Sequence, residues 1–422
     1  MKAPTAKAGP FRRFLSILGP GLVTGAADDD PSGIVTYSIA GAQLGTSLLW
    51  TAFLTWPLMW AVQMMCARIG LVSGVGLAGA LRKKFPRPLL VIAAVSLFVA
   101  NAINVSADLS GMADVMQMLT GVNARFYLVA FGCTIILVTV RFPYQTIASI
   151  LKWLATVLFS YVITAFIVHP NWSTVLSSTF LPHWPSGHAE WSTLVAILGT
   201  TISPYLFFWQ ASQEIEEEKA KGRKTEASRR GAPEVDLHNR ALDVGVGTFF
   251  SNFIMYFIIL TTAVTLHQNG VTNLESSRDA VQALRPLAGN YAALLYSTGL
   301  IGVGFLAIPT LAGSSAYAFS ETFGWRQGLD QKLRRARAFY GVLVCSIAIG
   351  IALSFTKINP MDALFLTAVI NGILAPFLLV GILWVASDSQ IMQKQPSSIL
   401  VRIIVAITTL GMFGAAIALF LV

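Results

Sequence analysis

Three consecutive carboxylates interrupt the first long apolar stretch of the chain. Asp28, Asp29 and Asp30 follow an apolar segment that begins at Phe14, and a second apolar half covers residues 34–49. An ionisable residue inside a membrane span costs about 2.5–3.5 kcal/mol on insertion scales, so such residues normally face an ion or substrate path. The sequence therefore predicts a cation site inside the first span. The alternative is a span that starts later and leaves the aspartates in a loop.

Backbone breaks are predicted at this place and in one later apolar stretch. The aspartates lead into Pro31, Ser32 and Gly33, which is a turn sequence, and Ser203-Pro204 interrupts the later stretch. Proline lacks an amide donor and clashes with the preceding turn, so both helices should unwind. Unwound backbone is tolerated at membrane depth only beside protein or a water-filled cavity, where its carbonyls can coordinate a cation.

The composition identifies the solvent around these elements. Only 12% of the 422 residues are charged, against about 25% in soluble domains, while 55% are hydrophobic and the mean hydropathy is +0.66. We therefore expect an all-α polytopic membrane protein. Eleven stretches are long enough to cross a hydrocarbon core of roughly 30 Å. They cover residues 14–41, 46–70, 88–112, 125–141, 146–169, 191–215, 241–266, 288–319, 338–356, 361–386 and 398–421.

The basic residues predict the orientation. With residues 1–13 as a cytoplasmic tail, 25 of the 29 Lys and Arg residues lie on the inside, which leaves Arg125, Arg278, Arg285 and Lys357 outside. The positive-inside rule then places the N-terminus in the cytoplasm and the C-terminus outside. This accounts for the net charge of +9 without a nucleic-acid partner. The charged run from Glu214 to Arg240 is expected to be a solvated cytoplasmic loop, with a regulatory site as the alternative.

The two predicted breaks lie in matching positions. Spans one and six begin two sets of five, residues 14–169 and 191–386, and span eleven, residues 398–421, is additional. Because each set has an odd number of spans, the two sets are inverted in the membrane. Paired broken helices in such repeats indicate a transporter site at the midplane. No nucleotide-binding loop, metalloprotease motif or catalytic triad is present, so an enzyme is not expected.

These segments resemble the Nramp family of divalent-metal transporters. Gly19-Pro20-Gly21, Asp30-Pro31-Ser32-Gly33 and Ala40-Gly41-Ala42 match its first helix, G-P-G…D-P-G-N…A-G-A, and residues 199–205 match its sixth-helix segment G-A-T-V-M-P-H. The resemblance implies a LeuT-like fold of two inverted five-helix repeats plus one helix. It also implies alternating access around a midplane ion.

The resemblance assigns four positions to the metal. Asp30 matches the metal-binding aspartate, and Thr200 stands where a backbone carbonyl of the sixth helix binds metal. Gly33 replaces the family's asparagine, and Ser203 replaces its methionine. The remaining oxygen ligands, with retained waters, suit Mg²⁺ and Mn²⁺. These substitutions resemble those of the Nramp-related magnesium transporters.

Further departures concern the proton route of proton-coupled relatives. Tyr205 and Gln210 replace two histidines. Asp108 matches the acidic pair D-x-x-E in span three, but its glutamate is Gly111 here. Loss of both histidines weakens the case for proton coupling.

Other polar residues inside spans are weaker candidates. Asp28 and Asp29 either hold a hydrated dication near the site or cap the second half-helix. Asn101, Asn104 and Asp108 share one helix face that lines the ion path or bonds to other helices. Asn371, before Gly372, could approach the ion.

The leading hypothesis is a plasma-membrane carrier that moves Mg²⁺ or Mn²⁺ by alternating access, without proton coupling. It requires no cofactor, its partners are the ion and the lipid bilayer, and the sequence does not fix its oligomeric state. The alternatives are a proton-coupled importer of Mn²⁺ or Fe²⁺ and a cation-driven LeuT-like carrier of an organic solute, for which Gly33 leaves space.

Overall fold

The computed structural model describes residues 19–142, 154–356 and 358–422, and these fold into helices without a strand. The N-terminal tail and residues 146–153 of the fifth expected span lie outside the described residues. The long helices are α4 (Trp50–Ser73), α6 (Arg87–Thr120), α7 (Ala124–Arg141), α14 (Glu234–Thr265), α17 (Ala292–Phe323), α18 (Arg337–Leu353), α19 (Pro360–Ser387) and α20 (Ile399–Leu421).

Two further pairs form the broken helices, namely α2 (Pro20–Asp28) with α3 (Pro31–Leu44), and α11 (His188–Thr201) with α12 (Pro204–Ala220). The short elements are α5 (Leu77–Leu81), η1 (Leu154–Leu158), α9 (Phe159–Ile167), α10 (Trp172–Phe180), α13 (Glu226–Arg229), η2 (His267–Asn269), α15 (Ser277–Val281), η3 (Gln282–Leu284), α16 (Arg285–Ala288) and η4 (Gly289–Tyr291).

Local chemistry sets the helix ends. Proline stands at the start of α2, α3, α12 and α19, where its missing amide donor has no helical acceptor to lose. Three long helices end at a glycine in the left-handed region, namely Gly74, Gly121 and Gly324. Both kinds of signal are readable in the sequence, which is why the expected spans and the helices agree closely.

Seven helical segments of the described residues are long and apolar enough to cross a membrane, with the pair α11–α12 counted as one. Of the other four expected spans, the first overlaps α2–α3, the second overlaps α4, the fifth overlaps α9 and the ninth overlaps α18. The total of eleven crossings stays a prediction.

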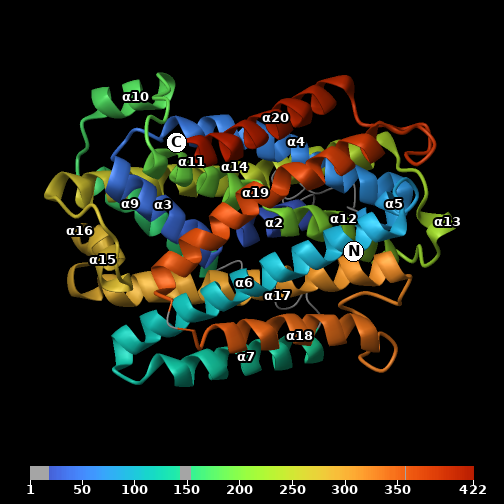
Figure 1. Ribbon diagram of the computed structural model, residues 1–422, viewed down its shortest axis with the longest axis horizontal. Coiled ribbons are helices and arrows are strands. Elements are labelled where there is room, and N and C mark those ends of the chain that lie inside the picture. Colours follow the sequence, from blue (N-terminus) through green and yellow to red (C-terminus); the bar gives the residue numbers. More distant parts are fainter. Residues whose placement is uncertain (1–18, 143–153, 357) are drawn as a thin grey trace, which may run out of the picture.

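The helices run along one common direction, and the connections gather at its two ends (Figure 1). One end carries α10, α15 and α16, and the opposite end carries α5 and α13. This grouping agrees with the alternation expected from the basic residues. Which end faces the cytoplasm stays a prediction.

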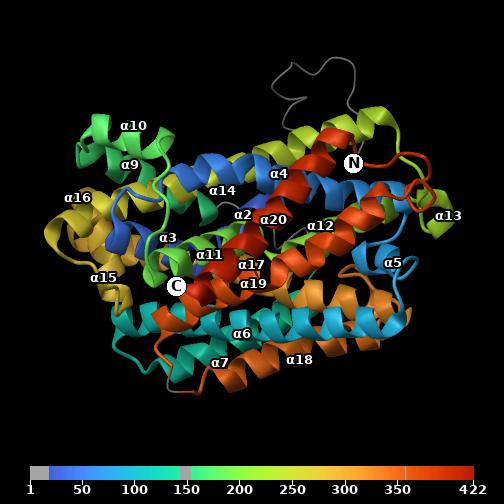
Figure 2. The same ribbon diagram turned by 45° about the horizontal axis from the view of Figure 1, so that its top comes forward.

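The broken helices lie inside the bundle. Helices α6, α7, α17 and α18 lie together on one side, and α4 and α14 lie on the other (Figure 2). All residues from Pro31 to Ala42 and from Thr193 to Ile215 are buried. The core of the bundle therefore encloses both breaks.

The charged run from Glu214 to Arg240 was expected to be a solvated loop, and this was wrong for its two ends, whereas most of residues 221–233 between them are exposed. Helix α12 continues to Ala220, α14 already begins at Glu234, and Glu214 is fully buried. Arg240, 7% exposed, contacts Glu214, Glu217 and Asp243. Burial of these groups is offset by the contacts of Arg240 with all three acids and by the backbone amides that donate to Asp243.

Candidate functional site

The first break leaves helix α2 at Asp29 and re-enters a helix at Pro31. Asp29 has φ −79° and ψ 53°, and Asp30 is extended with φ −70° and ψ 171°. The Oδ1 atom of Asp30 accepts a hydrogen bond of 2.7 Å from the Gly33 amide. The cap of α3 is therefore Asp30, and the capping alternative for Asp28 and Asp29 was wrong. The last carbonyls of α2 have no helical donor and can accept from other groups.

The second break has the same design. Ile202 leaves the helix with φ −118° and ψ 57°, Ser203 is extended, and Pro204 begins α12. The single proton of the Ser203 hydroxyl is shared between the Gly199 carbonyl at 2.8 Å and the Thr200 carbonyl at 2.6 Å. Ser203 thus holds the carbonyl of Thr200 at the end of α11, and its own lone pairs remain free to accept.

The two breaks meet at Gly33. A Cβ atom on Gly33 would lie 2.9 Å from Thr200 Oγ1, 3.4 Å from Asp30 Oδ1 and 3.4 Å from the Asp28 carbonyl oxygen. The Thr200 hydroxyl therefore occupies the space where a side chain at position 33 would begin. A carboxylate, a hydroxyl and a freed carbonyl converge here, and Asp30, Thr200 and Ser203 are at most 3% exposed.

Helix α6 brings two more polar groups to Asp30. Asn104 Nδ2 donates to Asp30 Oδ2 at 3.4 Å. Asp108, one turn further, is fully buried, and neither of its carboxylate oxygens accepts a hydrogen bond within the described residues. Asn101 instead donates to the Leu311 carbonyl and to Ser315 on α17. The predicted polar face of α6 thus divides between the ion region and helix packing.

Asp28 and Asp29 point toward a residue that the sequence did not single out. The Ser251 hydroxyl of α14 lies 2.6 Å from Asp28 Oδ2 and 3.1 Å from Asp29 Oδ1. Both aspartates are fully buried, with one oxygen each lacking a partner in the described part of the chain. A lone serine in an apolar helix carries no sequence signal, and only its place opposite the aspartates marks it.

The remaining predicted residues lie at different distances from the break. The Tyr205 hydroxyl donates to the Ala27 carbonyl of α2 at 3.0 Å. Gln210 donates to Glu214 at 2.7 Å, away from the break. Asn371 is buried on α19, which packs backbone to backbone against α11, because a Cβ atom on Gly372 would lie 2.3 Å from the Val195 carbonyl.

Gly111, which stands where the family's D-x-x-E pair has its glutamate, lies in a close contact between helices α6 and α19. A Cβ atom on Gly111 would lie 2.9 Å from Leu364 Cδ1 on α19. The Leu364 carbonyl in turn accepts the Ser32 hydroxyl at 2.8 Å. This place is therefore occupied by an apolar contact that also holds α3.

The charge of the site is uncompensated. Asp28, Asp29, Asp30 and Asp108 make no ion pair with a basic side chain among residues 19–142, 154–356 and 358–422. No cluster of three or more His, Cys, Asp and Glu side chains suited to a metal occurs there either. A bound cation would therefore take several ligands from carbonyls, hydroxyls or water.

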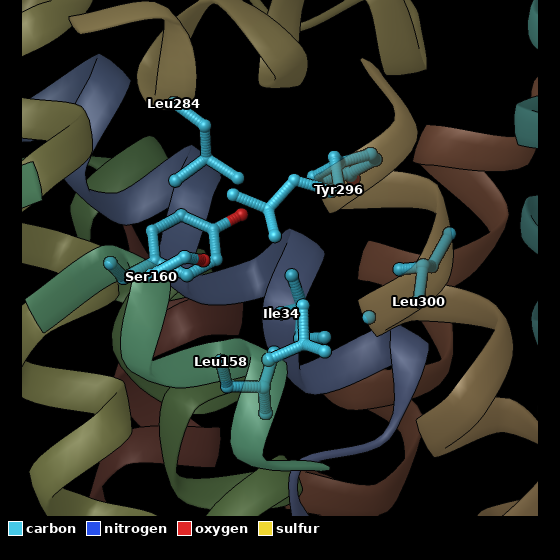
Figure 3. Close-up of a pocket in the computed structure, with 10 residues that line it drawn as sticks. Ile34, Leu158, Ser160, Leu284, Tyr296 and Leu300 are labelled. Carbon is cyan, nitrogen blue, oxygen red and sulfur yellow. The ribbon is translucent and has the colours of Figure 1, made fainter. Parts of the chain in front are cut away.

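A small hollow lies beside α3, the second half of the first broken helix (Figure 3). It is lined by Ile34 of α3, Leu158, Ser160, Leu284, and Tyr296 and Leu300 of α17. None of its lining residues is ionised at neutral pH, and the side chains drawn are mostly apolar. It is therefore separate from the oxygen-lined region at Gly33.

The N-terminal end of α2 is held by an ionic cluster, which we call the α2 anchor: Arg240, Glu214, Glu217 and Asp243. The Asp243 carboxylate accepts from the amides of Gly19 and Gly21 at 2.8 Å each and from that of Leu22 at 3.1 Å. Arg240 binds Glu214 at 2.8 Å and also contacts Glu217 and Asp243. The anchor gives the free donors of α2 an anionic partner.

Two broken helices at the centre of a helical bundle define a LeuT-like transporter fold. The structure superposes on Mhp1, a nucleobase-cation-symport-1 family transporter, with a TM-score of 0.58 at 16% identity, covering 96% of this chain and 91% of that one. MhsT gives a TM-score of 0.57 at 14% identity, with 94% and 98% covered.

The chain belongs to the Nramp family. The family model described as "Natural resistance-associated macrophage protein-like" matches residues 21–422. Curated relatives include the "Divalent metal cation transporter MntH" of Yersinia pestis (strain Pestoides F), 26% identical over 313 residues, with 72% of this chain and 73% of the relative covered. The protein of the same name from Mesorhizobium japonicum is 26% identical over 311 residues, covering 72% and 67%.

Among solved structures, the Eremococcus coleocola manganese transporter matches with a TM-score of 0.71 at 18% identity, covering 98% of this chain and 88% of that one. The family is one of transporters, not enzymes. The expected LeuT-like, all-helical fold and the Nramp resemblance are thereby confirmed.

Proposed function

We propose that this protein carries divalent cations across the plasma membrane by alternating access around the site at Gly33. Family membership and relatives named as divalent metal and manganese transporters support the class of cargo. The metal residues are Asp30, Thr200 and Ser203, with Gly33 as the open position, and Asn104 and Asp108 stand behind Asp30. Asp28, Asp29, Tyr205, Gln210 and Asn371 complete the surrounding ion path.

We further propose that the preferred ions are Mg²⁺ and Mn²⁺, as in the Nramp-related magnesium transporters. The observation that carries this proposal is the convergence of oxygen atoms from Asp30, Thr200 and the Asp28 carbonyl around Gly33. At the family's thioether position, Ser203 contributes a hydroxyl that is bonded to the Thr200 carbonyl. An all-oxygen donor set favours hard cations that keep part of their water shell.

Transport is proposed to be uncoupled from protons. Phenol and amide groups do not take up a proton near neutral pH. Here Tyr205 and Gln210 replace the two histidines, and each is engaged in a hydrogen bond to another helix residue. Gly111 packs on Leu364 where the family has a glutamate. Proton coupling, the alternative, could operate through Asp108 and the carboxylates of Asp28, Asp29 and Asp30.

A carrier of an organic solute is not favoured. The space left by Gly33 is bounded by Thr200 Oγ1, 2.9 Å from where a Cβ atom would lie. An ion with a few waters fits such a region better than an organic molecule, because drug-sized ligands use cavities of about 300–1,000 Å³.

A proteoliposome flux assay tests this proposal. Protein reconstituted with a pH indicator inside should take up Mg²⁺ and Mn²⁺ without changing the internal pH, and Asp30→Ala should abolish uptake. Asp362→Ala, which removes an exposed carboxylate at the start of α19, should retain it. Metal uptake by Asp30→Ala at the parent rate would disprove the site. Acidification that accompanies metal entry would instead support the proton-coupled alternative.

A further inference from the structure

Besides the apolar hollow beside α3, a polar cavity of about 750 Å³ lies at the end of the bundle that carries α5 and α13. It is enclosed by α5, the end of α12, the segment before α13, and the connection from α17 to α18. Its size falls within the range of about 300–1,000 Å³ typical of small-molecule sites. It is lined by a different set of residues from the site at Gly33, and the proposed transport cycle does not use it.

The charge of this cavity is strongly positive. Six basic and three acidic side chains line it: Arg82, Lys219, Lys224, Arg229, Arg326, Arg335, Glu216, Glu321 and Asp330. Two of the acids are already engaged, because Glu216 pairs with Lys219 at 2.8 Å and Glu321 accepts from the Gly79 amide at 2.9 Å. The cavity therefore has three more basic than acidic side chains.

Four cations of the cavity have no partner. Within the described residues, the side chains of Arg82, Lys224, Arg326 and Arg335 make no hydrogen bond or ion pair, and all four are exposed. The other two are engaged, since Lys219 binds Glu216 and Arg229 donates to three backbone carbonyls. The positive-inside rule explains why basic residues gather at one end of the bundle, but it does not require unpaired cations to surround one cavity.

Two further features point to a ligand. The Ser320 hydroxyl, fully buried at the cavity wall, lacks a hydrogen-bond partner in the described part of the chain. Trp325 lines the cavity with 41% of its surface exposed, and its ring stacks on Phe323 at 5.0 Å between centroids. Arginine forks match phosphate oxygens, and an exposed, braced indole offers a face to a planar ring.

We propose that this cavity binds a multiply phosphorylated anion, with the phosphates on Arg82, Arg326, Arg335 and Lys224. A nucleoside triphosphate satisfies both the cations and the Trp325 face, and the phosphate headgroup of an anionic lipid satisfies the cations alone. The bound anion would connect α5, α12 and the α17–α18 connection, and so bridge elements of both halves of the chain. Binding can be measured without transport, so its outcome is independent of the proposed cargo.

Binding to the purified full chain in neutral-lipid nanodiscs tests the proposal, with ATP and inorganic tripolyphosphate as soluble probes in the presence of EDTA. Both should bind saturably. The double variant Arg82→Gln/Arg326→Gln should weaken both by about tenfold or more, since each loses charge-assisted hydrogen bonds. The matched control is Arg334→Gln, an exposed neighbour of Arg335 that does not line the cavity, and it should change neither affinity.

Trp325→Leu tests the base and the phosphates of the ligand separately. It should weaken the binding of ATP and leave the binding of tripolyphosphate unchanged. The lipid arm measures the cardiolipin, an anionic lipid with two phosphates, that co-purifies with each variant. If neither soluble probe binds, and lipid retention falls in the double variant but not in Arg334→Gln, the phosphate comes from lipid. Equal behaviour of these two variants toward all three probes, at equal melting temperature, overturns the proposal. If the double variant is destabilised, Arg335→Gln replaces it in the same comparison.

Discussion

The contact between Gly33 and Thr200 limits the space at the proposed ion site. The family motif has asparagine and alanine at these positions, and this chain has glycine and threonine. The structure gives a steric reason for the joint change, since Thr200 Oγ1 lies 2.9 Å from where a Cβ atom of residue 33 would lie. The smaller Gly33 on α3 accompanies the larger Thr200 on α11. The Thr200 hydroxyl supplies an oxygen atom, which glycine at position 33 cannot.

Coupling between these positions is measurable. Gly33→Ala should destabilise the protein by about 1–3 kcal/mol through overpacking and lower Mg²⁺ uptake. Thr200→Ala in the same chain should recover most of the loss, because it removes the clashing hydroxyl. Melting temperature and flux of both single variants and the double variant provide the test. Strictly additive effects would contradict a direct contact.

Ser203 is the position expected to govern ion softness. Ser203→Met adds a thioether, so the ratio of Cd²⁺ to Mg²⁺ uptake should rise. Ser203→Ala serves as the control, since it also removes the hydroxyl that bonds the Thr200 carbonyl but adds no sulfur. An unchanged ratio in the methionine variant, or an equal rise in both variants, would argue against Ser203 as a ligand position.

Residues next to prolines and turn sequences were predictable, and residues defined by their partners were not. Asp30 and Ser203 could be predicted as site residues because the prolines that follow them, Pro31 and Pro204, indicate breaks in apolar helices. Ser251 escaped because nothing near it in sequence indicates the aspartates that it contacts, 222 and 223 positions away. The α2 anchor was not anticipated for the same reason, since Asp243 meets Gly19 across 224 positions.

At the scale of elements, helix α2 packs closely against α14 because glycines line their contact. A Cβ atom on Gly25 would lie 2.2 Å from the Gly247 carbonyl oxygen, and one on Gly247 would lie 2.2 Å from the Gly21 carbonyl oxygen. Small residues at helix interfaces in membranes allow this close approach. The position of the first break relative to the second therefore depends on glycines as well as on charges.

Replacing one of these glycines should displace α2. Gly247→Ala should lower the melting temperature and metal uptake together, because its methyl group meets backbone. Gly245→Ala lies in the same helix, and its Cβ atom would lie an ordinary 3.6 Å from the Trp60 ring. Alanine favours helix over glycine by about 1 kcal/mol, so Gly245→Ala should be neutral or stabilising. Equal losses in both variants would contradict close packing as the cause.

Element boundaries were predictable where apolar periodicity ends at a proline or glycine, and less so beside charges. The sixth and seventh spans were expected to cover 191–215 and 241–266, whereas α12 ends at Ala220 and α14 begins at Glu234. Pairing across helices lets charged turns continue inside the protein. A one-dimensional pattern cannot reveal that pairing.

At the scale of the whole molecule, the connections lie at two ends, and the predicted orientation assigns α13 to the cytoplasm and α15 to the exterior. In a chain whose native cysteines are replaced by serine, Arg278→Cys should react with a membrane-impermeant maleimide on intact cells. Ala227→Cys, exposed on α13, should react only after permeabilisation. The opposite labelling pattern would invert the orientation and place the basic cavity outside.

The α2 anchor has a consequence for synthesis in the cell. Helix α2 has only nine residues, and three amides at its start find their acceptor on Asp243. While the first five spans are being made, that acceptor does not yet exist, and unsatisfied amides in lipid cost several kcal/mol each. Helix α2 is therefore expected to reach its final place only after the seventh span has been inserted. Chain truncations that end before Asp243 should leave it unanchored and open to degradation.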